Sequence, residues 1–121
     1  RLYLHGLSLG AMNSEASTDL LQLLDDPIDG ALWSGPPFPS RIWRSLIQDR
    51  EPDTPIWLPR YRDGRFVRFM NQSGSPVPGD SPWGRIRIVY LQYASDPIVF
   101  FDYRDAWRRP AWMQAPLGPD V

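Results

Sequence analysis

The sequence predicts an α/β fold of three layers, in which helices flank a mostly parallel sheet. Three observations support this prediction: a strand-helix-strand unit in residues 2–34, a helical pattern that follows it, and a strongly β-forming run at Ile86–Tyr93. A helix-containing connection of about 25 residues joins the first two strands, and parallel strands require one because a tight turn cannot join them. The expected core strands lie near residues 2–5, 31–34 and 86–93.

The first unit begins with a short apolar strand and continues into a helix from Leu9 to about Glu15. Ser17 or Thr18 is expected to cap a second helical segment, Asp19–Asp25, because a hydroxyl at that position accepts from free N–H groups of the next turn. Leucines give this segment an apolar face. The sequence thus predicts two helical segments between the first two strands.

The middle of the chain is expected to contain one helix and several irregular segments. Ser40 is expected to cap a helix at residues 41–49, which has apolar side chains on one side. Residues 51–60 are rich in proline and are expected to be irregular. The alternation at residues 65–70, after an Asp-Gly turn, predicts a small strand or one arm of a hairpin. A loop at residues 71–83 then leads to the central parallel strand.

Composition limits the classes of partner. The chain is 42% hydrophobic and 22% charged, as is typical of a globular domain. Its net charge of -1 gives no electrostatic reason to expect nucleic acid as a partner, although all 13 basic residues are arginine. No apolar run approaches the roughly 20 residues that span a bilayer, so we expect no membrane-spanning segment in these residues. The oligomeric state is left open.

The sequence also limits the chemistry. It contains no cysteine, which excludes disulfides and thiolate metal sites. One histidine and scattered acidic residues do not supply the ligand spacing of a metal-dependent hydrolase. We therefore expect neither a metal nor another cofactor.

A Gly-x-Ser-x-Gly pattern at residues 6–10 is the main candidate for a catalytic motif. It lies directly between the first strand and the first helix, which is the context of a nucleophile elbow. In such a turn the serine backbone is strained, and Gly6 and Gly10 leave room for it. Ser8 would be the nucleophile, and the backbone N–H of Leu9 would donate to the oxyanion that forms when Ser8 attacks a carbonyl. The alternative is a surface serine between ordinary strand-end and helix-packing glycines.

Asp96 and His5 are the other candidates for proton-transfer chemistry. Asp96 directly follows the strongest expected strand, and functional groups of α/β sheets gather beyond the carboxyl ends of the strands. It would there orient a histidine base near Ser8, or it would only cap the turn at its Asp-Pro step. His5 is the only histidine and precedes Ser8 in the same strand, so we expect it to be packed or hydrogen-bonded beneath the elbow rather than to act as the base.

The six tryptophans are expected to anchor the core and the loops rather than to stack on a ligand. Arg108 and Arg109 would meet an anionic head group if the protein lies at a membrane, or they form a solvated pair at a helix end. We expect the solvated pair.

Three separated blocks of the sequence, in order, resemble the α/β-hydrolase superfamily. The blocks are Leu2–Gly10, Asp29–Pro37 and Tyr90–Val99, and the likeness continues through Arg108–Pro110 to residue 120. More narrowly, they resemble the bacterial membrane-anchored α/β-hydrolase family, in which transmembrane helices precede a C-terminal hydrolase domain.

The resemblance implies that residues 1–121 form a partial α/β-hydrolase catalytic domain, from the nucleophile elbow to beyond the acid strand. It implies Ser8 as nucleophile and Asp96 as the acid of a Ser-Asp-His triad, with the earlier strands and the histidine outside these residues. The implied function is a serine hydrolase that cleaves an ester, thioester or related acyl bond of a small-molecule or lipid substrate through an acyl-serine intermediate. The resemblance also implies a membrane-associated parent protein, which would contact the membrane only through segments outside these residues.

Two other functions remain compatible with the same residues. An acyltransferase would use the same serine with an acceptor other than water. A non-catalytic interaction domain would retain the hydrolase fold without the activity. A histidine in a loop beyond residue 121 would favour the enzyme.

Overall fold

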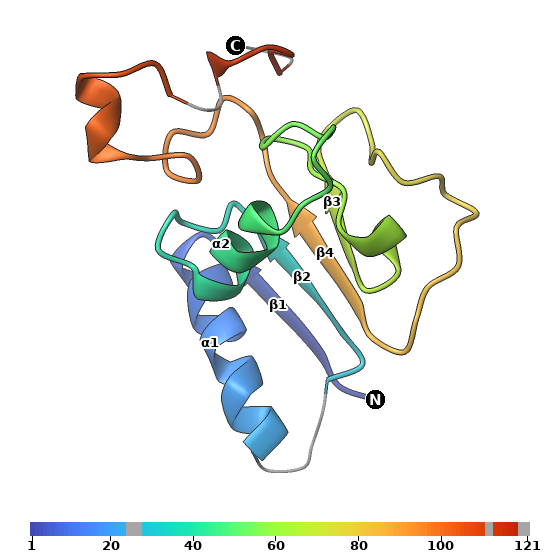
Figure 1. The fold of residues 1–121 in the computed structure, drawn as a ribbon. Coiled ribbons are helices and arrows are strands. Elements are labelled where there is room, and N and C mark those ends of the chain that lie inside the picture. Colours follow the sequence, from blue (N-terminus) through green and yellow to red (C-terminus); the bar gives the residue numbers. More distant parts are fainter. Residues whose placement is uncertain (24–27, 111–112, 119–121) are drawn as a thin grey trace.

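A four-stranded, all-parallel sheet forms the centre of the protein (Figure 1). The computed structural model describes residues 1–23, 28–110 and 113–118. The predicted α/β class and parallel sheet are confirmed. The described elements include β1 (Tyr3–Leu7), α1 (Leu9–Leu23), β2 (Gly30–Ser34), α2 (Arg41–Gln48), β3 (Val67–Met70) and β4 (Arg87–Leu91), and the short 3₁₀ helices η1 (Arg62–Gly64) and η2 (Tyr103–Ala106).

The strands lie in the order β1-β2-β4-β3, so β4 has the interior position that the sequence predicted. β3 pairs with β4 in parallel, from Val67 opposite Ile88 to Met70 opposite Leu91. The predicted strand near residues 65–70 is therefore present, but its interpretation as a hairpin arm is wrong. The connection at residues 71–86 carries the chain back to the starting end of the sheet before β4 begins, and this makes the pair parallel.

One row of residues across the sheet forms the middle of the core. Gly6, Trp33, Tyr90 and Phe69 stand in register on β1, β2, β4 and β3. The Trp33 and Tyr90 ring centroids are 5.3 Å apart and those of Tyr90 and Phe69 are 5.2 Å apart. All three aromatic side chains are fully buried, and each such burial contributes about 1.5–3 kcal/mol.

Both helices cover the face of the sheet that carries this row (Figure 1). Trp33 Nε1 donates to Ser14 Oγ of α1 at 2.9 Å, and Trp43 Nε1 of α2 donates to Gln92 Oε1 at 2.8 Å. On the opposite face of β1 and β2, hydrophobic side chains are exposed, namely Tyr3, Leu7 and Leu32.

Helix α1 is continuous, whereas the sequence predicted two segments divided near Ser17 and Thr18. The two hydroxyls do not cap a new helix. Ser17 Oγ donates to Asn13 O at 2.9 Å and Thr18 Oγ1 donates to Ser14 O at 3.4 Å, so each bonds back to the preceding turn of the same helix. The predicted apolar face of residues 19–25 lies outside the described side chains.

Helix α2 begins directly after Ser40, as predicted, but without the predicted side-chain cap. Ser40 Oγ is fully buried and makes no hydrogen bond to the residues that the structure describes. Instead, Glu15 Oε1 of α1 accepts from the Ile42 N–H at 2.7 Å. A carboxylate from another helix thus accepts a hydrogen bond from a first-turn amide of α2. Its negative charge also interacts favourably with the positive end of the helix dipole.

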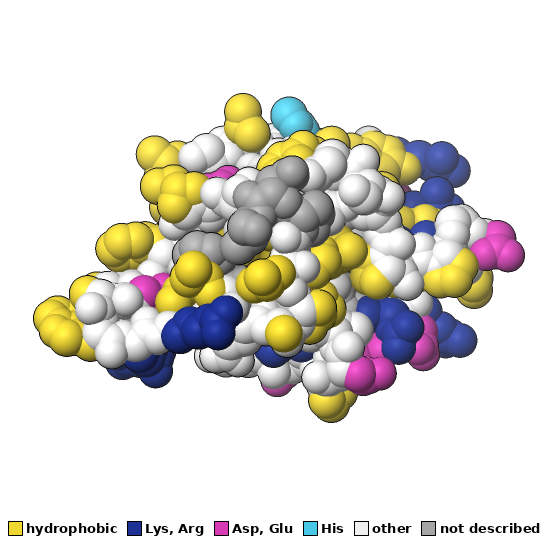
Figure 2. Space-filling model, turned by 90° about the horizontal axis from the view of Figure 1, so that it is seen from above, with side chains coloured by type: hydrophobic (Ala, Val, Ile, Leu, Met, Phe, Trp, Pro, Cys, Tyr) yellow, Lys and Arg dark blue, Asp and Glu magenta, His cyan; other side chains and the backbone are white. Residues whose placement is uncertain are grey.

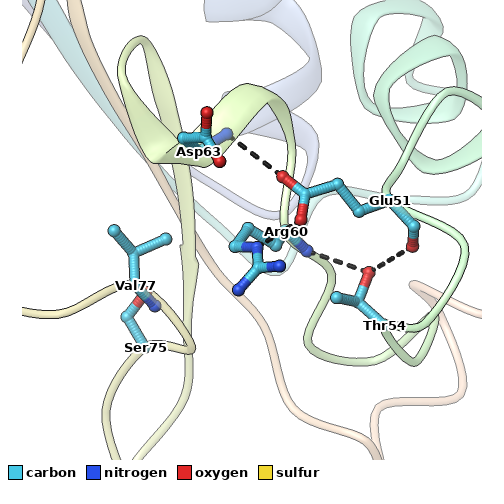
Figure 3. Close-up of polar contacts among 6 residues, drawn as sticks. All are labelled: Glu51, Thr54, Arg60, Asp63, Ser75 and Val77. Carbon is cyan, nitrogen blue, oxygen red and sulfur yellow. Dashed lines mark hydrogen bonds and ion pairs between the residues drawn. The ribbon is translucent and has the colours of Figure 1, made fainter.

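Polar contacts close the proline-rich loop at residues 51–60, which is irregular as predicted (Figure 3). The Glu51 carboxylate pairs with the Arg60 guanidinium and accepts from the Asp63 N–H at 3.1 Å. Thr54 Oγ1 donates to Glu51 O at 2.8 Å and accepts from the Arg60 N–H at 3.1 Å. The hydrogen bond from Arg60 to Glu51, and then the charge of Glu51, raise the pKa of Arg60.

The tryptophans divide into anchored and exposed ones. Trp33 and Trp43 are buried, Trp57 Nε1 donates to Pro116 O at 3.0 Å, and the Arg68 guanidinium lies 3.8 Å from the centroid of the Trp83 ring. For these four the predicted anchoring is confirmed. Trp107 is 84% exposed, so the prediction is wrong for this residue, because the segment after η2 leaves its ring in solvent. Trp112 lies outside the described residues.

The arginine pair at the end of this segment is exposed, as predicted. Arg108 nevertheless has a partner: one of its guanidinium nitrogens lies 3.2 Å from Asp102 Oδ2. Arg109 has no ion pair with the residues that the structure describes.

Candidate active site

Ser8 lies in a tight turn between β1 and α1, at the carboxyl end of the sheet. Its φ of 55° is in the left-handed region, which non-glycine residues rarely adopt. The Ser8 N–H donates to Ser34 O of β2 at 2.8 Å, and its carbonyl accepts from the Ala11 N–H at 2.9 Å. The neighbouring strand and the first helical turn therefore hold this backbone from both sides, while the side chain is exposed.

The two glycines of the Gly-x-Ser-x-Gly pattern have different surroundings. A β-carbon on Gly6 would overlap Gly10 O and lie 2.6 Å from Ala11 Cα. Helix α1 can therefore pass this close to β1 only over a glycine. At Gly10, apart from its chain neighbours and the adjacent backbone of α1, no described atom lies within 4 Å of the place of a β-carbon, so the structure gives no steric reason for glycine there.

Leu9 is the first residue of α1 and is 63% exposed. Its N–H has no acceptor within the helix, as is general for first-turn amides, and none elsewhere in the described part of the chain. A developing negative charge beside the Ser8 hydroxyl would meet this free donor and the positive end of the helix dipole.

Asp96 lies beyond β4, beside the end of β2. Its Oδ1 accepts from the Ile98 N–H at 2.9 Å, so the turn-capping contact considered from the sequence is present. Its Oδ2 lies 3.3 Å from the place of a β-carbon on Gly35, whose φ is 53°. Gly35 directly follows Ser34, the residue that accepts from the Ser8 N–H. Asp96 and Ser8 therefore flank the same end of β2.

A buried glutamine fixes the segment that leads to Asp96. Gln92 is fully buried one residue after β4. Its Oε1 accepts from Trp43 Nε1 at 2.8 Å, and its Nε2 donates to Trp57 O at 3.1 Å. These bonds tie the end of β4 to α2 and to the loop at residues 51–60.

His5 lies on the face of β1 opposite α1, and its side chain is exposed. It stands in register with Leu32 of β2, and no hydrogen bond to its ring is found among the described residues. The prediction that His5 is packed or hydrogen-bonded is wrong, because no described element covers this face of β1. His5 and the helix that follows Ser8 therefore lie on opposite faces of β1.

Glu15 is a core residue that no sequence motif identified. It is 3% exposed, and its carboxylate accepts from the Ile42 N–H at 2.7 Å and from the Tyr90 hydroxyl at 2.8 Å. Burial, followed by the Glu15 charge, raises the pKa of Tyr90. Glu15 thus joins the helix that follows Ser8 to α2 and β4. In the sequence, only its helical spacing from Ala11 and Thr18 indicates that Glu15 lies on the same side of α1 as these residues. The structure shows that this side is buried.

Two negative findings apply to residues 1–23, 28–110 and 113–118. Within them, no group of three or more metal-ligating side chains (His, Cys, Asp or Glu) is placed to hold a metal ion. Within the same described ranges, no helix has the length and apolar character to cross a membrane.

The chain matches the sequence model of the alpha/beta-hydrolase family over residues 1–121. It belongs to the α/β-hydrolase family. No curated protein and no solved structure matches it. The resemblance of this α/β-hydrolase chain to the superfamily is thereby confirmed, and its parallel sheet with a strand-turn-helix at Ser8 fits a hydrolase-type fold.

Proposed function

We propose that this α/β-hydrolase is a serine hydrolase that cleaves an ester, thioester or related acyl bond, with Ser8 as nucleophile and Asp96 as triad acid. The observation that carries the proposal is the left-handed backbone of Ser8, with φ 55°, between a parallel strand and a helix. Such a conformation costs about 1–3 kcal/mol and persists where the surrounding structure enforces it. It holds an exposed hydroxyl at the end of the sheet, where a substrate has access.

In the proposed reaction, Ser8 Oγ attacks the acyl carbon and its proton passes to a histidine outside residues 1–121. The Leu9 N–H donates to the oxyanion, and one such donor is typically worth about 10²–10³-fold in rate. The histidine gives the proton to the departing alkoxide or thiolate, and water then hydrolyses the acyl-Ser8 ester. Asp96 orients the histidine and stabilises its charged form.

A fluorophosphonate probe tests the proposal, because it reacts covalently with an activated serine. In the protein that contains the proposed histidine, we expect Ser8 to be labelled and Ser8→Ala to lose labelling. Asp96→Asn is expected to slow labelling by up to about 10⁴-fold, because the histidine loses its orienting acid.

Two variants serve as controls. Ser17→Ala removes an exposed hydroxyl from α1, the helix that follows Ser8, and His5→Ala removes the exposed histidine of β1. Both are expected to be labelled like the wild type. Absence of labelling at Ser8 in the folded, histidine-containing protein would contradict the proposal and favour a non-catalytic interaction domain.

A further inference from the structure

A cavity of about 450 Å³ lies between α2 and the segment that follows β4. This volume is within the range of pockets that bind small molecules. Its apolar wall includes Trp43 and Ile47 of α2 and Phe100, with the Trp43 and Phe100 centroids 6.0 Å apart, edge to face. Phe38 and Phe101 continue this wall with centroids 5.1 Å apart. The cavity therefore offers an apolar wall with several aromatic side chains to a ligand.

Arginines line the same cavity. Arg108 pairs with Asp102 at 3.2 Å, and the Arg104 N–H, followed by the Arg108 charge, lowers the pKa of Asp102. Arg44 of α2 and Arg104 of η2 form no ion pair with any carboxylate in the described part of the chain. With Asp105, the lining carries three arginines against two aspartates and has a net positive charge.

The cavity adjoins the turn that carries Asp96. The Phe38 N–H donates to Ile98 O at 3.0 Å, and the Ile98 N–H donates to Asp96 Oδ1 at 2.9 Å. Neither Ser8 nor Asp96 lines the cavity itself. Figure 2 looks onto the carboxyl end of the sheet and shows arginine side chains among hydrophobic ones. The cavity is thus placed to hold a part of a substrate that lies away from the reacting bond.

We propose that this cavity recognises an amphiphilic carboxylate and so defines the substrate class of the hydrolase. The hydrocarbon or aromatic body would pack against Trp43 and Phe100, and the carboxylate would bind Arg44 and Arg104. Guanidinium groups without a carboxylate partner match the planar, bidentate geometry of a carboxylate. The link to Ser8 rests on the proposed function, whereas ligand binding does not require catalysis.

Calorimetric titration at low salt with phenylbutyrate, phenylbutanol and phenylbutylamine tests the inference, because these ligands share a body and differ in charge. We expect phenylbutyrate to bind about tenfold more tightly than phenylbutanol, since each of two exposed guanidinium groups contributes about two- to fivefold. Phenylbutylamine is expected to bind most weakly. The preference for the carboxylate should decrease at high salt, which screens exposed charges.

Variants on the cavity rim separate charge recognition from apolar binding. Arg44→Gln and Arg104→Gln are each expected to weaken phenylbutyrate binding about two- to fivefold and to leave phenylbutanol binding unchanged. Asp105→Asn is expected to strengthen phenylbutyrate binding, because it removes a negative charge from the lining. Arg41→Gln is the matched control, since Arg41 is an exposed arginine of α2 outside the cavity.

Three results would overturn the inference: no binding of phenylbutyrate, equal affinity for phenylbutyrate and phenylbutanol, or equal losses in the Arg41→Gln and Arg44→Gln variants. Ser8→Ala should bind phenylbutyrate like the wild type. Binding without fluorophosphonate labelling would contradict the proposed function alone. Labelling of Ser8 without a preference for the carboxylate would contradict this inference alone.

Discussion

At the scale of single residues, the conformation of Ser8 depends on how closely α1 approaches β1. The Ser8 N–H is held by Ser34 O, and the first turn of α1 bonds to the Ser8 carbonyl. Only a glycine at position 6 leaves space for this approach, because any β-carbon would meet Gly10 O and Ala11 Cα. The left-handed backbone of Ser8 therefore depends on the absence of a β-carbon at Gly6.

Gly6→Ala is expected to destabilise the protein by about 1–3 kcal/mol, the usual cost of inserting a methyl group into a packed contact. Gly10→Ala is the matched control, because its added methyl group would meet no atom of another element within 4 Å among the described residues. Alanine should stabilise α1 there by about 0.5–1 kcal/mol. Urea unfolding followed by far-UV circular dichroism measures both free energies of unfolding. Equal changes in the two variants would contradict the steric explanation.

The residues that sequence reasoning found and missed differ in the range of their contacts. The placement of Ser8 and Asp96 at the carboxyl edge of the sheet was predictable, because each follows a predicted strand and parallel strands end at one edge. Glu15 was missed because its carboxylate contacts Ile42 and Tyr90, which are 27 and 75 residues away along the chain. The burial of His5 was wrongly predicted because strand periodicity assigns a residue to a face and does not say which face is covered.

At the scale of elements, prediction from the sequence failed where a side chain can form either of two local hydrogen bonds. The hydroxyls of Ser17 and Thr18 can cap a new helix or bond back within an existing one, and both have the same sequence signal. Helix α2 was predictable from its apolar face, which buries Trp43, Leu46 and Ile47. The pairing of β3 with β4 was not predictable, because the connection between them determines whether neighbouring strands are parallel.

Tyr90 connects β4 to α1 through its hydroxyl, and it makes the free energy of unfolding depend on pH in the alkaline range. Burial, and then Glu15, raise its pKa in the folded protein above the unfolded value of about 10. Its contribution is fully present below pH of about 10 and is lost as pH rises further, because the unfolded chain releases the phenolic proton while the folded protein retains it. This group should lower the free energy of unfolding by up to about 1.4 kcal/mol per pH unit above that value.

Tyr90→Phe is expected to lack this alkaline component and to be less stable at neutral pH by about 1–3 kcal/mol, because the buried Glu15 carboxylate loses a hydrogen-bond donor. Tyr3→Phe is the control, because Tyr3 is 60% exposed on the uncovered face of β1. Urea unfolding of both variants and the wild type at a series of pH values from neutral to above 10 provides the measurement. If the free energy of unfolding of Tyr90→Phe decreases with pH as steeply as that of the wild type, Tyr90 is not the origin of the pH dependence.

At the scale of the whole molecule, the described residues cover the two faces of the sheet unequally (Figure 1). Helices α1 and α2 pack on one face, whereas Tyr3, Leu7 and Leu32 are 60%, 69% and 41% exposed on the other. β1 is also an edge strand in the order β1-β2-β4-β3. An apolar face beside an open strand edge favours association with a further protein segment.

Residues 1–121 produced alone are therefore expected to self-associate through the Tyr3, Leu7 and Leu32 face and the edge of β1. Leu32→Lys should shift the population toward the monomer, because a charge in this strand face opposes edge and face pairing. Leu117→Lys is the matched control, since Leu117 is a 51% exposed hydrophobic residue outside the sheet and should leave association unchanged. Size-exclusion chromatography with light scattering over a range of protein concentrations measures the populations. A monomer at every concentration, or equal effects of the two substitutions, would show that this surface does not drive association.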